Sequence, residues 1–138
     1  MVIIAGVDEA GRCPVIGPLV VAAVSFIEES IDELSHMGVR DSKALSSRKR
    51  ESLVLEIMAF CECYSYFDLQ PWAIDIVVNR AKKLRRLNFL EAMAMAKTIR
   101  DLRPDRVYVD AADVIPERFR DDILRVLDWC PHLICEKK

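Results

Sequence analysis

Two short acidic segments are the residues of this chain whose types and spacing suit catalytic chemistry. Asp8 and Glu9 follow an apolar run, and Asp110 and Asp113 follow another apolar run much later in the sequence. Carboxylates suit Mg²⁺, which needs only one or two of them because water and substrate phosphate complete its shell. Two such ions a few ångströms apart commonly drive hydrolysis of a phosphodiester. The segments suit a divalent-cation site facing a phosphate, but by pattern alone two acidic loops are more often a solvated rim.

The adjacency of Asp8 and Glu9 limits how both can serve one site. Neighbouring residues on a strand point to opposite faces, so both acids reach one site only if the chain leaves strand geometry there. Gly11 and Pro14 make such a departure plausible. The residues alone nevertheless favour one acid as a metal ligand and the other as a structural residue.

Asp110 gives the strongest physical argument for a metal ion. If its strand lies beside the first strand, Asp8 and Asp110 are lateral neighbours about 5 Å apart at the backbone. Two anions this close repel each other unless a cation lies between them. Asp113, further along the loop, is expected mainly to cap it.

The elements that must position these acids alternate along the chain. Hydrophobic periodicity and turn residues predict the elements. Strands are expected at 2–7, 19–27, 61–69, 106–109 and 133–135, and helices at 46–60, 71–78, 88–102 and 116–127. Ser46 is the expected N-cap of one helix, and Asn88 with Glu91 has the spacing of a capping box. This order predicts an α/β fold with an antiparallel edge and a parallel half.

Composition sets the outer bounds. A chain of 138 residues with 52% hydrophobic residues is one domain at most and can build a packed core. With 20 basic and 22 acidic residues, the net charge of the chain does not indicate nucleic-acid binding. It does not exclude it either, because a local basic face matters more for such binding than the total charge. Five cysteines without C-x-x-C spacing disfavour zinc, and with no signal peptide they indicate a reduced cytoplasmic setting. The apolar stretch 14–27 is too short for a membrane span.

The order of residues within these motifs is more informative about the family than the composition of the chain. Asp8-Glu9-Ala10-Gly11-Arg12-Cys13-Pro14-Val15-Ile16-Gly17-Pro18 resembles the opening signature of the type 2 ribonucleases H, ribonuclease HII, and most of all the archaeal branch. Three further stretches agree in order and spacing. They are Arg40-Asp41-Ser42-Lys43 with Leu45-Ser46, Leu87-Asn88 with Glu91, and Asp110-Ala111-Ala112-Asp113-Val114.

The resemblance implies a fold and an activity. The expected fold is a ribonuclease H-like mixed sheet, with three antiparallel strands plus parallel strands flanked by helices, in one catalytic domain over 1–138. The implied enzyme is a cytoplasmic endonuclease that hydrolyses the RNA strand of RNA/DNA hybrids and cuts at ribonucleotides embedded in duplex DNA. Its two-metal hydrolysis leaves 3′-hydroxyl and 5′-phosphate ends, and its full-length form is expected to be a monomer.

The resemblance also assigns residues to the site. Mg²⁺ or Mn²⁺ would be held by Asp8, Glu9 and Asp110, which are the expected catalytic and metal-binding residues. The turn Gly11-Arg12-Cys13 would contact substrate and meet the sugar 2′-OH, the group that distinguishes RNA from DNA. Lys43 would contact a phosphate.

The chain departs from the family pattern twice. The turn reads Gly11-Arg12-Cys13 where the family has Gly-Arg-Gly, and the chain stops at Lys138. In the family a Lys-Ala-Asp stretch with a fourth carboxylate comes at about this point, and a helical C-terminal region follows. The 138-residue chain is therefore expected to lack the C-terminal part of the domain, to have little or no activity and to self-associate.

Two rival functions remain open from the sequence. One is a non-catalytic hybrid-binding or structural fragment of the same fold. The more remote one is an α/β protein that binds a small nucleotide. It is disfavoured because Gly6, Gly11 and Gly17 do not form the G-x-G-x-x-G phosphate loop.

Overall fold

A mixed five-stranded sheet organises the protein. The computed structural model describes residues 1–10, 19–39, 44–69, 83–111 and 115–137. The strands are β1 (Ile3–Ala10), β2 (Leu19–Ile27), β3 (Cys63–Leu69), β4 (Arg106–Ala111) and β5 (His132–Lys137). The helices are η1 (Glu28–Ser30), α1 (Asp32–His36), α2 (Ser47–Phe60), α4 (Lys83–Leu102) and α5 (Pro116–Arg125).

The strand order confirms the predicted mixture of pairings. The order across the sheet is β3-β2-β1-β4-β5. β1 and β3 each pair antiparallel with β2, whereas β1, β4 and β5 run parallel. β1 therefore stands at the junction of the two halves, and its neighbour in the parallel half is the strand that ends in Asp110.

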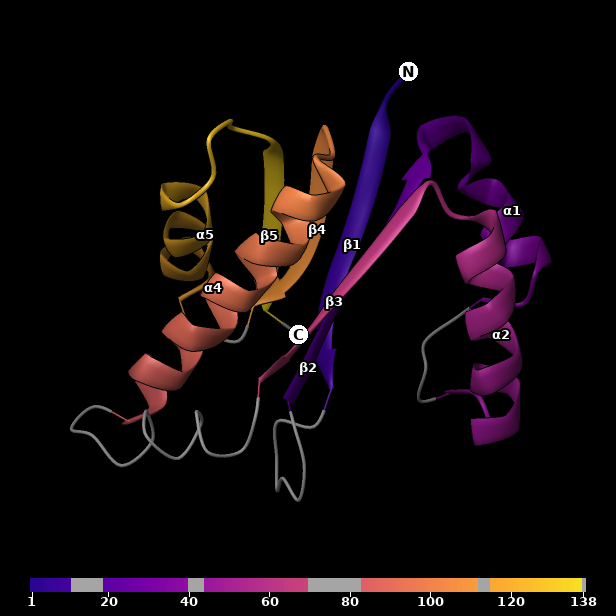
Figure 1. Cartoon of the computed structure of the whole chain (residues 1–138), viewed down its shortest axis with the longest axis horizontal. Coiled ribbons are helices and arrows are strands. Elements are labelled where there is room, and N and C mark those ends of the chain that lie inside the picture. Colours follow the sequence, from indigo (N-terminus) through magenta and orange to yellow (C-terminus); the bar gives the residue numbers. More distant parts are fainter. Residues whose placement is uncertain (11–18, 40–43, 70–82, 112–114, 138) are drawn as a thin grey trace.

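One face of the sheet carries the core. Side chains alternate along each strand, so Val7, Val109 and Leu133 share a face and are buried. α4 and α5 cover this face and bring buried Met95 and Phe119 against it. Figure 1 shows these helices together, whereas α1 and α2 gather beyond the antiparallel strands.

α4 packs closely because its inward residues are small. Ala92, Ala94 and Ala96 are buried, and Met95 and Ile99 fill the space between them and the strands. Alanine has the highest helix propensity and lets a helix approach a sheet closely. The close packing fixes the strands that end at the acidic residues.

The start of α4 corrects one prediction. The capping-box pattern placed the first turn at Asn88, but the helix already begins at Lys83. Asn88 and Glu91 are therefore interior helix residues, and both are buried. Leucine, lysine and arginine are strong helix formers, so the segment before Asn88 continues the helix.

α2 bears out its predicted boundary. Ser46 is its N-cap, and the Ser46 hydroxyl accepts a hydrogen bond of 3.1 Å from the Lys49 backbone N–H. Leu53 is its buried residue, and Phe60 meets Phe26 of β2 with ring centroids 6.0 Å apart. α2 thus touches the sheet near one end.

The expectation of a short helix at 71–78 stays untested, because that segment lies outside the described residues. Within the described part of the chain, no helix is long and apolar enough to cross a membrane.

Candidate active site

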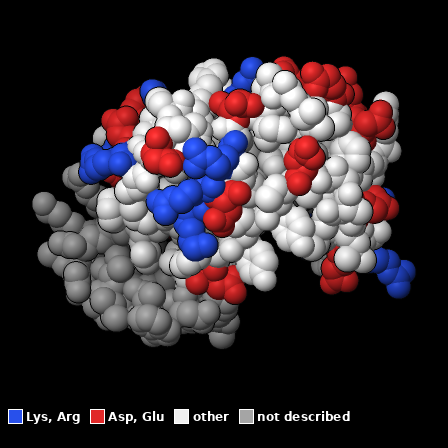
Figure 2. Space-filling view, turned by 45° about the horizontal axis from the view of Figure 1, so that its top comes forward, with Lys and Arg blue, Asp and Glu red and all other residues white. Residues whose placement is uncertain are grey.

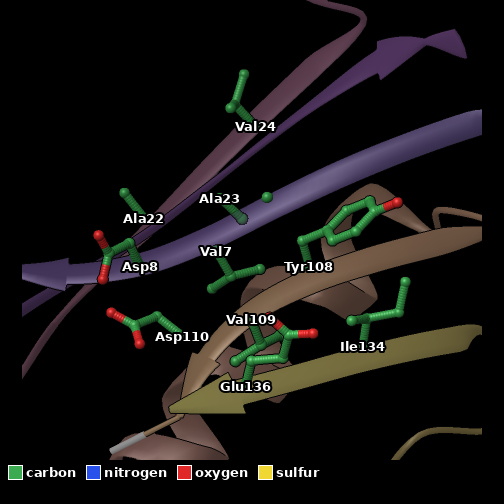
Figure 3. Close-up of a pocket in the computed structure, with 11 residues that line it drawn as sticks. Val7, Asp8, Ala22, Ala23, Val24, Tyr108, Val109, Asp110, Ile134 and Glu136 are labelled. Atoms are coloured by element: carbon green, nitrogen blue, oxygen red, sulfur yellow. The ribbon is translucent and has the colours of Figure 1, made fainter. Parts of the chain in front are cut away.

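A hollow of about 600 Å³ lies on the sheet face opposite α4 and α5, and we call it the open-face hollow. Its lining residues come from four strands: Gly6, Val7, Asp8, Ala22, Ala23, Val24, Tyr108, Val109, Asp110, Ile134 and Glu136. Apolar side chains form most of its wall, and carboxylates come from three parallel strands. Figure 3 shows these residues around the strand ends.

Asp8 and Asp110 come together at one end of the hollow. β1 and β4 are in parallel register through Val7 and Val109, so Asp8 and Asp110 are the next residues along the two strands. Their carboxylates point toward one another in Figure 3. The adjacency that the sequence argument required is therefore present.

A backbone contact orients the first of these acids. The Glu9 N–H donates a hydrogen bond of 2.8 Å to Oδ1 of Asp8. The bond fixes the rotation of the Asp8 side chain. A carboxylate with a set orientation loses less conformational entropy when it takes a ligand.

Glu9 lies on the other side of the sheet. β1 keeps strand geometry through Ala10, so Glu9 shares the helix-covered face with Val7 and does not line the hollow. Its Oε2 atom is buried. The structure thus separates the Glu9 carboxylate from the facing pair, and a direct ligand role for Glu9 stays a prediction.

The donors that face each other suit a hard cation. Among the described residues, no group of three or more His, Cys, Asp or Glu has a metal-holding arrangement. Two facing carboxylates still meet the need of Mg²⁺ or Mn²⁺, because such ions keep several waters when protein ligands are few. An all-oxygen donor pair does not favour zinc, which prefers nitrogen and sulfur ligands.

Several predicted site residues lie outside the described part of the chain. These are Gly11, Arg12, Cys13, Lys43 and Asp113. Their contacts with substrate therefore remain predictions.

Sequence reasoning missed Tyr108 and Glu136, which share the hollow with the acids. Tyr108 precedes Asp110 by two strand positions and so points to the same face, an alternation that was visible in the sequence. Glu136 was missed because the last strand was ended at Cys135, whereas β5 runs to Lys137.

The face of the described residues seen in Figure 2 shows no broad basic field. Figure 2 shows Lys and Arg gathered in a group with acidic side chains beside them. On α4 and its following loop, Lys97 lies 3.5 Å from Asp101, and Arg103 lies 3.2 Å from Asp128. These pairs neutralise much of the local charge.

Comparison with known proteins identifies the family. A family model described as ribonuclease HII matches residues 5–138. The chain belongs to the ribonuclease HII family. Curated ribonucleases HII are similar along most of the chain, with 42% identity over 135 residues for Thermococcus sibiricus and 41% over 122 residues for Methanosarcina mazei.

The ribonuclease HII family also supplies similar solved structures. The ribonuclease H2 of Pyrococcus horikoshii OT3 superposes with a TM-score of 0.85 at 37% identity, covering 99% of this chain and 63% of that one. Ribonuclease HII of Archaeoglobus fulgidus, solved in a complex with PCNA, gives 0.82 at 35% identity, with the same coverage of 99% and 63%. These likenesses confirm the ribonuclease H-like fold.

The alignments cover only part of the length of each relative. The alignment covers 96% of this chain but 58% of the Thermococcus sibiricus protein. For Methanosarcina mazei the shares are 88% and 54%. The chain therefore spans little more than half the length of these curated relatives.

Proposed function

We propose that this protein is the metal-binding part of an endonuclease that cleaves RNA in RNA/DNA hybrids and at ribonucleotides embedded in duplex DNA. The supporting observation is the facing of Asp8 and Asp110 at the ends of neighbouring parallel strands, in a member of the ribonuclease HII family. The products would be 3′-hydroxyl and 5′-phosphate ends. The setting is cytoplasmic, and the full-length form is a monomer.

The residues of the site divide the work. Bound Mg²⁺ or Mn²⁺ would lower the pKa of a coordinated water and neutralise phosphate charge. Asp8, oriented by the Glu9 N–H, and Asp110 from β4 would hold the ions. Glu9 is the third acid that the family pattern assigns, and its carboxylate would need a change at the end of β1 to join them.

The substrate contacts follow the motif. Gly11, Arg12 and Cys13 approach the sugar 2′-OH through backbone groups, and Lys43 approaches a phosphate. A Cβ at the last position of this turn restricts it, so Cys13→Gly in a form extended to the relatives' length should improve discrimination for ribose. Cleavage of a duplex with a single ribonucleotide measures the gain, and equal discrimination would mean that Cys13 is tolerated.

Metal binding tests the core of the proposal without requiring turnover. Mn²⁺ is titrated into the 138-residue chain, and free Mn²⁺ is followed by electron paramagnetic resonance. Asp8→Asn and Asp110→Asn should each raise the Kd about tenfold or more, since each removes a charge next to a dication. Glu9→Gln should have a smaller effect, because its carboxylate lies on the other face.

Glu117→Gln is the matched control, because Glu117 is an exposed acid on α5, behind the sheet. It should leave Mn²⁺ affinity unchanged. Equal Mn²⁺ titrations for the unaltered chain and Asp8→Asn would contradict the proposed site.

A non-catalytic hybrid-binding or structural role is the second candidate. One observation favours it: the described residues present a facing pair of acids rather than a three-ligand cage. We expect the 138-residue chain to cleave a hybrid at least ~100-fold more slowly than an extended form, because poor positioning of reacting groups has costs of this size. Comparable Mn²⁺-dependent rates would contradict this expectation.

A further inference from the structure

Glu136 brings another carboxylate to the open-face hollow from a third strand. β5 runs parallel to β4, and Glu136 is the register partner of Asp110. Both residues line the hollow, and Glu136 is exposed. Laterally paired residues of neighbouring strands lie about 5 Å apart at the backbone, so Glu136 continues the row that Asp8 and Asp110 begin.

The described lining of the hollow is acidic. It includes Asp8, Asp110 and Glu136, and no Lys or Arg is among the described lining residues. Within the described ranges, Glu136 has neither an ion pair nor a hydrogen bond through its side chain. Carboxylates held this close repel one another unless a cation lies nearby. The row therefore favours a cation more strongly than the facing pair alone.

The orientation of Glu136 differs from that of the facing pair. In Figure 3 the carboxylates of Asp8 and Asp110 point toward one another, whereas that of Glu136 points away from this pair. Glu136 is thus displaced from the line between the other two acids. Direct coordination of the same ion would require a different side-chain rotamer.

We propose that Glu136 is a positioning residue that accepts a hydrogen bond from a water on the metal ion held by Asp8 and Asp110. This inference rests on the proposed function. Mg²⁺ binds its waters at about 2.1 Å and gives them up reluctantly. A carboxylate hydrogen-bonded to such a water lies roughly 4 to 5 Å from the ion. The register pairs Glu136 with Asp110 on the neighbouring strand.

The test compares Glu136→Gln with the unaltered chain, Asp8→Asn and the control Glu117→Gln. The first readout is the Kd for Mn²⁺ by electron paramagnetic resonance. Loss of one charge at this distance should raise it about 3- to 10-fold in Glu136→Gln. The second readout is hexaamminecobalt(III), whose ammines do not exchange, so it can be bound only through its outer shell.

Glu136→Gln should weaken hexaamminecobalt(III) binding by a similar factor, whereas Glu117→Gln should change neither affinity. The number of waters on bound Mn²⁺, from water-proton relaxation, should be the same in Glu136→Gln and the unaltered chain. A gain of one water in the variant would mean direct coordination and would overturn the inference. So would equal Mn²⁺ affinities for Glu136→Gln and the unaltered chain.

The same set separates this inference from the proposed function. If Asp8→Asn loses Mn²⁺ binding while Glu136→Gln keeps it, the proposed site stands and the role of Glu136 is rejected. If the unaltered chain binds no Mn²⁺, both are rejected. Thermal unfolding of each variant distinguishes a lost contact from a lost fold, because an exposed Glu→Gln change should leave the unfolding midpoint nearly unchanged.

Discussion

The two faces of the sheet use the same strands for different purposes. On β4, Val109 is 4% exposed and packs under the helices, whereas its neighbour Tyr108 is 47% exposed in the open-face hollow. β1 repeats the division with buried Val7 and exposed Asp8. One step along a strand separates a residue that stabilises the fold from one that faces the site.

This division keeps two of the acids near water. A carboxylate that is buried without a partner loses its hydration uncompensated, which costs several kcal/mol. On the open face, Asp8 and Asp110 stay near water while the backbone that carries them is held by buried neighbours. The covered face therefore supplies the rigidity, and the open face supplies the charge.

Paired substitutions on the two faces should show the largest difference. Phe119 is fully buried on α5, so Phe119→Ala should cost about 3–5 kcal/mol of unfolding free energy. Tyr108→Ala should cost about 1 kcal/mol, because its ring is half exposed. Urea denaturation measures both. Equal losses of unfolding free energy in the two variants would mean that the open face contributes as much to stability as the helix-covered face.

A cluster at the opposite end of the parallel strands should have an intermediate effect. The Arg103 guanidinium lies 4.2 Å from the centre of the Trp129 ring and 3.2 Å from Asp128. The Trp129 Nε1–H donates a hydrogen bond of 3.4 Å to the Pro104 carbonyl. The cluster thus joins the loops that precede β4 and β5.

Trp129→Leu should cost about 1–3 kcal/mol in urea denaturation, since it removes the cation–π contact, the hydrogen bond and part of the packing. Arg103→Gln should cost less, about 0.5–1 kcal/mol. Mn²⁺ affinity should be unchanged in both, because the cluster lies before the strands and the acids lie after them. A parallel loss of Mn²⁺ binding would show that the two ends are coupled.

The division between faces also explains what could be predicted from sequence. Short apolar runs identified β1 and β2, alternation identified β3, and the Ser46 cap identified α2, because these signals are local. The facing of Asp8 and Asp110 was foreseen only as a condition, because strand adjacency is a tertiary property. Glu136 was missed because the end of β5 depends on its pairing with β4 rather than on its own residues.

The acid pattern at Asp8 and Glu9 shows a subtler limit. Their adjacency correctly indicated opposite faces for any chain that stays extended. Whether β1 ended before or after them was not encoded by a strong local signal, and pairing with β2 carries it to Ala10. Register with a neighbouring strand, rather than propensity, therefore decides which acid reaches the hollow.

The smallest predicted effect concerns the antiparallel edge, where β3 meets α4. The Ser65 hydroxyl donates a hydrogen bond of 2.7 Å to Asp101, and this bond lowers the pKa of the Asp101 carboxyl below its ordinary value of 3.8. Lys97 also lowers this pKa, and slight burial opposes both. A carboxyl with a lowered folded-state pKa contributes stability above its unfolded pKa, which is lost as pH falls through the folded value.

Ser65→Ala should therefore cost about 0.5–1 kcal/mol at pH 7, at the low end for a charge-assisted bond because Asp101 is exposed. The cost should shrink as pH falls below the ordinary Asp value of 3.8, where the carboxylate becomes protonated in both states. Urea midpoints of Ser65→Ala and the unaltered chain across this range measure the change, with exposed Ser35→Ala as the control. If the stability cost of Ser65→Ala stays constant through acid pH, Ser65 stabilises the fold by packing rather than by its bond to Asp101. The antiparallel edge would then be stabilised by packing, as the helix-covered face is.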